Sequence, residues 1–342
     1  MIGLERSPAR IALLWLAGLA LIVVSIAGAL TIGPSGLGLS DVWASFQAKI
    51  TGGDSGLSSI REGIIWNLRL PQSLLAAACG AGLAVCGAVL QSLLRNPLAD
   101  PFVLGVSSGA SLGAVSVVLL GVGAGVIGMA GGAFLGAVVA FALVLLLAAL
   151  AGGTTDRVVL AGIAGTQLFS ALTSFVVYTA ADAEQTRGVL FWLLGSLANP
   201  TWTEVSTCAA VTAAGLIVCL LCASALDAFT FGNDAAASLG IHVGRTRILL
   251  LGVTALITAV IVSVAGAIGF VGLVLPHAAR ALVGMRHRIM MPTVALIGAL
   301  FLIWVDVLAR TVIAPEELPV GVVTAIVGVP AFIAVLIRQG RR

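Results

Sequence analysis

The feature that most constrains this chain is its series of long, uninterrupted apolar blocks. Phe134–Leu150 reads FLGAVVAFALVLLLAAL, and Ile248–Val264 is a second block of similar length without a charged residue. A helix that crosses the hydrocarbon core of a bilayer needs about 20 mostly apolar residues. Strands of a membrane barrel would instead alternate apolar and polar residues over about 10 positions. The pattern therefore predicts an all-α, polytopic bundle of membrane helices.

The composition excludes an ordinary soluble domain. Hydrophobic residues make up 60% of the chain and charged residues 9%, with a mean hydropathy of +1.18, whereas a soluble domain carries roughly 25% charged residues. A soluble fold of this length could not remove so much apolar surface from water. The 42 glycines suit a membrane bundle, because small residues let helices approach closely.

The apolar runs predict about ten spans in one transmembrane domain covering residues 1–342. The first run follows Arg6 and Arg10, but it is long for a signal peptide and no small-residue cleavage site follows it, so it is interpreted as the first span. A polar stretch is expected at 33–63, and residues 182–202 are mixed and amphipathic. The predicted spans are 11–32, 67–93, 102–121, 126–151, 158–180, 204–225, 248–265, 269–284, 291–310 and 319–338.

The placement of Lys and Arg predicts the orientation. With an even number of spans both termini share a side, and that side receives twelve of the seventeen Lys and Arg residues. Cytoplasmic loops carry the excess of positive charge, so both termini are predicted to be cytoplasmic in a multi-pass protein of the cell membrane. The net charge of +3 is too small to indicate a nucleic-acid partner.

No catalytic or metal-binding motif is apparent. The five cysteines all lie within apolar blocks, and Cys219-x-x-Cys222 lacks the second ligand pair of a metal site, so it is interpreted as small apolar packing. The three histidines are scattered. Neither a nucleophile elbow, nor a zinc-protease motif, nor a phosphate-binding loop occurs. We therefore expect no cofactor, no metal and no enzyme activity in this chain, and any ATP hydrolysis must occur in a separate ATPase chain.

Several sequence blocks stand in a fixed order from about residue 65 to the end. They are LRLP at 68–71, GAGLAVCGAVLQ at 80–91, RNPLADP at 95–101, LGVSSGAS at 104–111, FWLLGSL at 191–197, LG at 239–240, GAIGFVGLVLPHAAR at 266–280, Asp306 to Arg310, and ELPVGVVTAIVGVPAFI at 317–333. Together these blocks resemble the FecCD family, which comprises the permease subunits of ABC importers for iron-siderophores, haem and vitamin B12. The resemblance implies ten spans per subunit, which agrees with the count above.

The resemblance implies a contact with the ATPase at the polar stretch 226–247. In the family this stretch is a coupling helix pair that sits in a groove of the ATPase. The Ala-rich run after Asp234 itself predicts a short helix with a capped N-terminus, with a solvated loop as the alternative. The residues expected to couple are Asp234, Ser238, Leu239, Gly240 and Arg245.

On the opposite face, the resemblance implies that Arg69 and Arg310 pair with glutamates of a substrate-binding protein. The planar guanidinium suits bidentate binding of a carboxylate, although an arginine near a span end can simply extend towards water. The family often has a further arginine where this chain has Gln72. Gln72 therefore replaces one of the expected docking charges.

Asp306 and the three-residue break at 154–156 each have both a structural and a functional interpretation. Asp306 lies one helical turn before Arg310, which favours an i,i+4 ion pair over a proton relay, because no further buried acids continue a relay. Thr154, Thr155 and Asp156 lie in the break between the fourth and fifth spans. The resemblance places them at the cytoplasmic gate of the path, whereas a plain turn is the alternative.

The function implied by the resemblance is that of a permease subunit that moves a metal chelate across the cytoplasmic membrane. Its partners would be two ABC ATPase subunits, a periplasmic or lipid-anchored substrate-binding protein, a second permease subunit forming a homo- or heterodimer, and membrane lipid. A ferric siderophore is the first choice of cargo because it is the commonest in the family, with haem or cobalamin as alternatives. Rival classes are an ion-coupled secondary transporter, which should show paired discontinuous helices, and a membrane enzyme, which should show a clustered polar site.

Overall fold

The structure is a computed structural model that describes residues 8–33, 36–123, 126–180, 183–314 and 316–340. Within these ranges the regular elements are helices, and no strand occurs. They are α1 (Pro8–Thr31), α2 (Leu39–Thr51), α3 (Ser59–Gly63), the π-helical turn η2 (Ile64–Arg69), α4 (Leu70–Leu93), the 3-10 turn η3 (Pro101–Leu104), α5 (Val106–Leu120), α6 (Met129–Leu150), α7 (Thr155–Ala180), α8 (Ala183–Leu193), α9 (Trp202–Leu221), α10 (Ala223–Phe229), α11 (Asn233–Ser238), α12 (Val243–Ala265), α13 (Val271–Val283), α14 (His287–Ala309) and α15 (Val320–Gly340).

The helices confirm the predicted bundle of membrane spans. Of the described helices, seven are long and apolar enough to cross a membrane, namely α1, the continuous helix from α3 to α4, α6, α7, α9, α12 and α14. Three shorter apolar helices, α5, α13 and the first part of α15, account for the remaining predicted spans. Each predicted span therefore corresponds to one helix.

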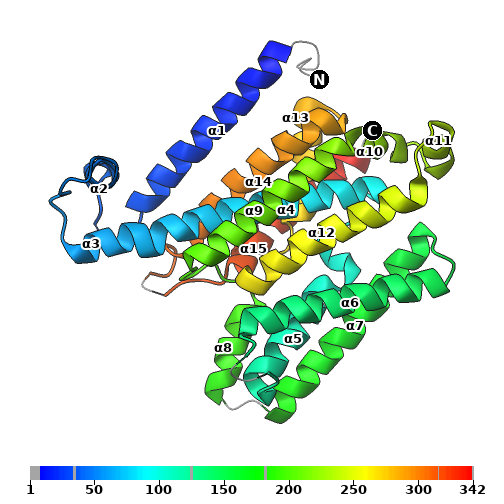
Figure 1. Cartoon of the computed structure of the whole chain (residues 1–342), viewed down its shortest axis with the longest axis horizontal. Coiled ribbons are helices and arrows are strands. Elements are labelled where there is room, and N and C mark those ends of the chain that lie inside the picture. The colour runs from blue at the N-terminus through cyan, green and yellow to red at the C-terminus, as the bar shows by residue number, and fades with distance from the viewer. Residues whose placement is uncertain (1–7, 34–35, 124–125, 181–182, 315, 341–342) are drawn as a thin grey trace.

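Helix α4 runs through the middle of the bundle (Figure 1) and packs against α9, α12, α13 and α14. Helices α5, α6 and α7 pack on one another as a separate group, which joins the rest through α12. Helix α1 lies along the edge of the bundle against α14. The start of α1 and the end of α15 lie towards the side where α10 and α13 are labelled (Figure 1).

Glycines set the contact between α4 and α14. A Cβ atom at Gly80 would lie 2.1 Å from the carbonyl oxygen of Gly298, and one at Gly298 would lie 2.2 Å from the carbonyl oxygen of Gly80. On another side of α4, a Cβ at Gly82 would collide with Ile261 of α12 and Thr212 of α9. The prediction that small residues on this span pack helices together is confirmed.

The structure corrects two predicted boundaries and adds one helix. The helix that contains the second span begins at Ser59. The stretch predicted to be polar contains α2, because Val42 and Phe46 of α2 pack against an apolar patch around Leu30 and Leu70. The third span begins its α-helix only at Val106. Its first residues form η3 instead, since a proline starts this turn and Gly105 ends it with a left-handed backbone (φ 73°).

Two opposite ends of the bundle hold the polar residues of interest, and each is given a name here. The Arg310 end carries Arg69, Gln72, Asp306 and Arg310, where α4 begins and α14 finishes. The α11 end carries α10, α11 and the start of α14. Helices α4 and α14 connect the two ends.

We expect Gly80→Ala to destabilise the protein by about 1–3 kcal/mol, because the added methyl group forces two tightly packed backbones apart. The matched control is Gly252→Ala on α12, where an added Cβ meets nothing within 4 Å. Thermal unfolding in detergent should show a lower midpoint for Gly80→Ala and no loss for Gly252→Ala. Equal midpoints for the two variants would contradict the close contact.

Candidate functional site

A hydrogen-bonded cluster closes the Arg310 end of the α4–α14 pair. The Gln72 amide nitrogen donates to Asp306 Oδ1 at 2.9 Å, and Arg310 Nε lies 3.2 Å from Asp306 Oδ2. The predicted i,i+4 pair between Asp306 and Arg310 is therefore confirmed. Asp306 is 1% exposed, so its negative charge is compensated by Gln72 and Arg310 and not by water.

The two arginines of this end cap helix α1. Arg310 donates to the carbonyl oxygen of Ala29 at 2.9 Å, and Arg69 donates to the carbonyl oxygen of Leu30. The last carbonyls of a helix have no partner within the helix, and positive charge is favourable there. Residues far apart in the sequence thus meet because the C-terminus of α1 needs donors.

Burial adds a condition to the predicted docking of a binding protein. Arg69, Gln72 and Arg310 lie together at one end, but they are 6%, 6% and 7% exposed. A partner's carboxylate would have to compete with the carbonyls of α1 for these guanidinium groups. Docking at these three residues stays a prediction.

The α11 end presents a short, exposed helix. The predicted helix after Asp234 is present as α11, but the expected cap is wrong: Gly232 occupies the N-cap position without a side-chain bond, and Asp234 lies inside the first turn. Leu239 follows the helix with 72% of its surface exposed, and Phe231 before the helix is 82% exposed. These two exposed apolar side chains, one on each side of α11, are available for contact with a partner.

The remaining residues predicted for coupling surround this patch. Ser238, Gly240 and Arg245 are all exposed. The hydroxyl of Ser238 donates to the carbonyl of Ala235, so this side chain is bonded within the last turn of α11. The patch around α11 is therefore apolar with polar and cationic neighbours.

Arg247 joins the predicted gate to α11. Its guanidinium donates to Asn233 Oδ1 at 2.9 Å and to Thr155 Oγ1 at 3.3 Å. Thr154 and Asp156, on either side of Thr155, are exposed. The structure thus brings the turn before α7 and the start of α11 together. No pattern in the sequence points to Arg247, because a single arginine at a span end is uninformative by itself.

Three further residues of this end form a chain of hydrogen bonds that sequence reasoning missed. Asp227 on α10 bonds to His287 on α14, and His287 bonds to Ser92 on α4. They are separated by 60 and 195 positions in the sequence. A local pattern cannot indicate such contacts, and a lone histidine is uninformative.

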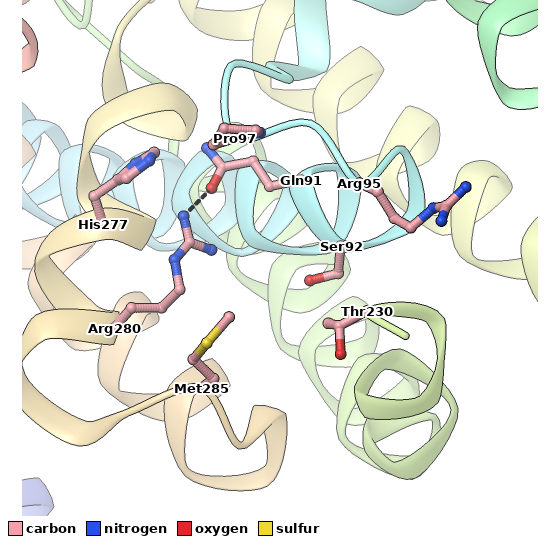
Figure 2. Close-up of a pocket in the computed structure, with 8 residues that line it drawn as sticks. All are labelled: Gln91, Ser92, Arg95, Pro97, Thr230, His277, Arg280 and Met285. Atoms are coloured by element: carbon pink, nitrogen blue, oxygen red, sulfur yellow. Dashed lines mark hydrogen bonds between the residues drawn. The ribbon is translucent and has the colours of Figure 1, made fainter. Parts of the chain in front are cut away.

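A cavity of about 320 Å³ lies beside this chain, between α4, α13 and the residues that follow α10. Figure 2 shows Arg280 reaching across it to Gln91, to whose side-chain oxygen it donates. Gln91 in turn donates to the carbonyl of Leu273 at 3.1 Å, so the head of Arg280 is held in place. Ser92 and Thr230 also line the cavity.

The break between α4 and α5 is built by side-chain caps. Asn96 accepts from the backbone N–H of Leu98, and Asp100 accepts from that of Phe102 at 3.0 Å. The prolines of the RNPLADP block cannot continue a helix, and these caps satisfy backbone N–H groups in the break. Burial raises the pKa of Asp100 to about 6, since a buried carboxylate loses hydration.

In the part of the chain that the structure describes, no group of three or more His, Cys, Asp or Glu side chains is arranged to hold a metal ion. All five cysteines are free thiols, and only Cys222 is not fully buried.

We expect Asp306→Ala to destabilise the protein by about 3–5 kcal/mol, because it leaves the buried Arg310 without its counter-ion. Replacing the ion pair as a whole, with Asp306→Leu and Arg310→Met, should cost much less. Thermal unfolding in detergent distinguishes the variants. If the single and double variants unfold at the same midpoint, the pair is not the source of the effect.

The raised pKa of Asp100 predicts a pH dependence of stability. Its folded value of about 6 lies above the ordinary 3.8, so the folded state holds the proton more tightly than the unfolded state. The cost of ionising Asp100 is absent below pH 3.8 and grows as the pH rises through about 6. Asp100→Asn keeps an acceptor for Phe102 and should therefore gain stability at neutral pH but not in acid. Unfolding midpoints of both proteins across this range test it, and parallel curves would contradict it.

Comparison with known proteins agrees with this architecture. A model of the FecCD transport family matches residues 20–338. The cobalamin import system permease protein BtuC of Halobacterium salinarum is 42% identical over 82% of this chain and 75% of its own length. The hemin transport system permease protein HmuU of Yersinia pestis is 38% identical over 80% of this chain and 84% of its own. The Fe(3+)-citrate import system permease protein YfmD of Bacillus subtilis is 37% identical, covering 81% and 82%.

The fold matches as well. A solved structure of a metal-chelate type ABC transporter in an inward-facing conformation superposes with a TM-score of 0.81. The match covers 95% of this chain and 99% of that chain, at 28% identity. With a family model matching nearly the whole sequence and relatives of about the same length, this chain belongs to the FecCD transport family.

Proposed function

We propose that this chain is the non-catalytic permease subunit of an ABC importer that moves a bulky metal chelate across the cell membrane. The observation that carries the proposal, given the family, is the exposed helix α11 at one end of the bundle. It is tied to the bundle by Arg247 and by Asp227 on the preceding helix. A soluble subunit seated on α11 could therefore push against the membrane helices.

The proposed ATPase surface consists of the residues predicted for coupling, Asp234, Ser238, Leu239, Gly240 and Arg245. Two ATPase subunits would bind two permease subunits, either copies of this chain or a paralogous pair. This places the α11 end and both chain termini in the cytoplasm, in line with the excess of Lys and Arg predicted for that side. Thr154, Thr155 and Asp156 would then lie at the inner mouth of the path, where Arg247 makes their position depend on α11.

The proposed docking surface for a substrate-binding protein is the Arg310 end. Arg69, Gln72 and Arg310 would meet carboxylates of the partner once the end of α1 has moved aside. Gln72 can donate a hydrogen bond but supplies no charge, so this surface relies on two cations. Guanidinium–carboxylate pairs are frequently bidentate, which adds geometric specificity to such a contact.

A ferric siderophore is the proposed cargo, and haem and cobalamin are the alternatives. Relatives named for cobalamin, hemin and ferric citrate are all between 37% and 42% identical to this chain. Overall similarity therefore separates these cargoes poorly.

The test of cargo is uptake into proteoliposomes that contain this chain, its ATPase and its binding protein. Radiolabelled ferric hydroxamate siderophore, ferric citrate, haemin and cyanocobalamin are supplied in turn, with and without ATP inside. ATP-dependent uptake of the siderophore supports the proposal, and uptake of another chelate replaces the cargo. Uptake driven by a proton gradient without ATP would instead establish the rival secondary transporter.

Leu239→Asp should abolish copurification of the ATPase, because it places an unpaired charge in the centre of an apolar contact. The matched control is Val312→Asp, an apolar residue at the Arg310 end that is 64% exposed. It should leave ATPase binding unchanged. Loss of the ATPase in both variants, or in neither, would count against a coupling surface at α11.

A further inference from the structure

The hydrogen-bonded chain at the α11 end links α10 to both central helices. Asp227 Oδ1 lies 2.6 Å from His287 Nδ1, and His287 Nε2 lies 2.6 Å from Ser92 Oγ. The backbone N–H of His287 also donates to Asp227 Oδ1 at 2.9 Å. Since a carboxylate only accepts, Nδ1 carries a proton and donates to it. One side chain of α10 therefore fixes both the ring and the first residue of α14.

The chain runs from the surface into the core. The Asp227 side chain is 40% exposed, whereas His287 is 2% and Ser92 6% exposed. The same residue types in the same order form the triad of serine hydrolases. Here, however, the Ser92 hydroxyl is buried and is also placed to donate to the Ala88 carbonyl of its own helix. The arrangement therefore holds helices together and does not present a nucleophile.

The two helices that receive this link extend to the other end of the bundle. Helix α4 leads from Ser92 to Gln72, and α14 leads from His287 to Asp306. At that end Gln72 and Asp306 are again hydrogen-bonded to each other. Between the two links the backbones touch at the glycines Gly80 and Gly298. Helices α4 and α14 are thus pinned to each other at both ends and in the middle, which favours movement as one body.

Few side chains are buried in the segment that follows α10. In α11 a single residue is buried, and the cavity beside Thr230 leaves space between this segment and Arg280 of α13 (Figure 2). Helix α10 itself is packed into the core through Leu226 and Phe229 and contacts both α4 and α14. Interiors transmit displacement through packed or bonded contacts. The bonds of Asp227 add to this packing a directional polar link to α14.

We propose that Asp227, His287 and Ser92 are positioning residues that transmit the displacement of α10 and α11 to the α4–α14 pair, and so to the Arg310 end. The inference rests on the proposed coupling of α11 to an ATPase. It adds the route by which nucleotide binding on one side changes the docking end on the other. A ligand shifts such an equilibrium only through contacts that differ between the two states, and this chain supplies a contact that can differ.

The test compares Asp227→Ala, Ser92→Ala and Asp227→Asn in the assembled importer with its ATPase and binding protein. The alanine variants remove the link, whereas asparagine keeps an acceptor for His287. The matched control is Thr293→Val on α14, which removes the hydroxyl that accepts a hydrogen bond from the Trp15 indole of α1 and leaves the residues of α10 unchanged. Uptake per ATP hydrolysed is measured for the four radiolabelled chelates named above.

We expect uptake per ATP to fall by about fivefold or more in both alanine variants, the low end of known coupling strengths. Asp227→Asn and Thr293→Val should stay near the wild-type ratio. A purely structural role would lower the amount of assembled importer in the alanine variants and leave the ratio unchanged, which would overturn the inference. If Asp227→Ala fails to assemble, Ser92→Ala decides.

A second readout does not depend on the cargo. Hydrogen exchange of the backbone amides in residues 70–80, at the Arg310 end, is compared with and without ATP and vanadate. Wild type should show a nucleotide-dependent change, and the alanine variants should lose it. A change that persists in both alanine variants would overturn the route. No ATPase binding to wild type would instead be a failure of the proposed function, and copurification detects it separately.

Discussion

The close backbone contact between α4 and α14 is the constraint on which the rest of this structure depends. In a membrane, helices gain little from hiding apolar surface from one another, so packing and hydrogen bonds must hold them together. Gly80 and Gly298 allow two backbones to meet, and that contact fixes which polar residues face each other at the two ends. Gln72 reaches Asp306 and Ser92 reaches His287 because the helices are in register at the glycines. Larger side chains at these glycines would separate both polar links at once.

The distribution of polar groups follows from the same solvent. Each of the three described ion pairs, Arg61–Asp41, His287–Asp227 and Arg310–Asp306, involves residues at or near helix ends. The middle of the bundle is apolar, because an unpaired polar group there is costly. As a member of the FecCD family, the chain therefore has its recognisable chemistry at two ends about one membrane thickness apart. Any coupling between those ends has to pass through helices and not through a continuous polar path.

Much of the fold could be predicted from the sequence, and less of the site. Long apolar runs are a local signal, so the ten spans were predicted correctly. The Asp306–Arg310 pair was also predicted correctly, because its two residues are four positions apart on the same helix. Helix α2 was missed because its short apolar face becomes meaningful only against Leu30 and Leu70. The Asp227–His287–Ser92 chain and the contacts of Arg247 join residues that tertiary packing alone brings together. The burial of Arg69 was also beyond the sequence, since its partner is a backbone carbonyl of α1.

The capping of α1 by two arginines has a consequence for the electrostatics of that face. While the last turn of α1 is seated, Arg69 and Arg310 donate to its carbonyls. If the end of α1 lifts, both guanidinium groups lose a carbonyl acceptor in a single step, while Arg310 stays paired with Asp306. The access of an anionic partner to these donors thus depends on helix position as well as on composition. The same two side chains present either occupied or free donors, depending on one turn of helix.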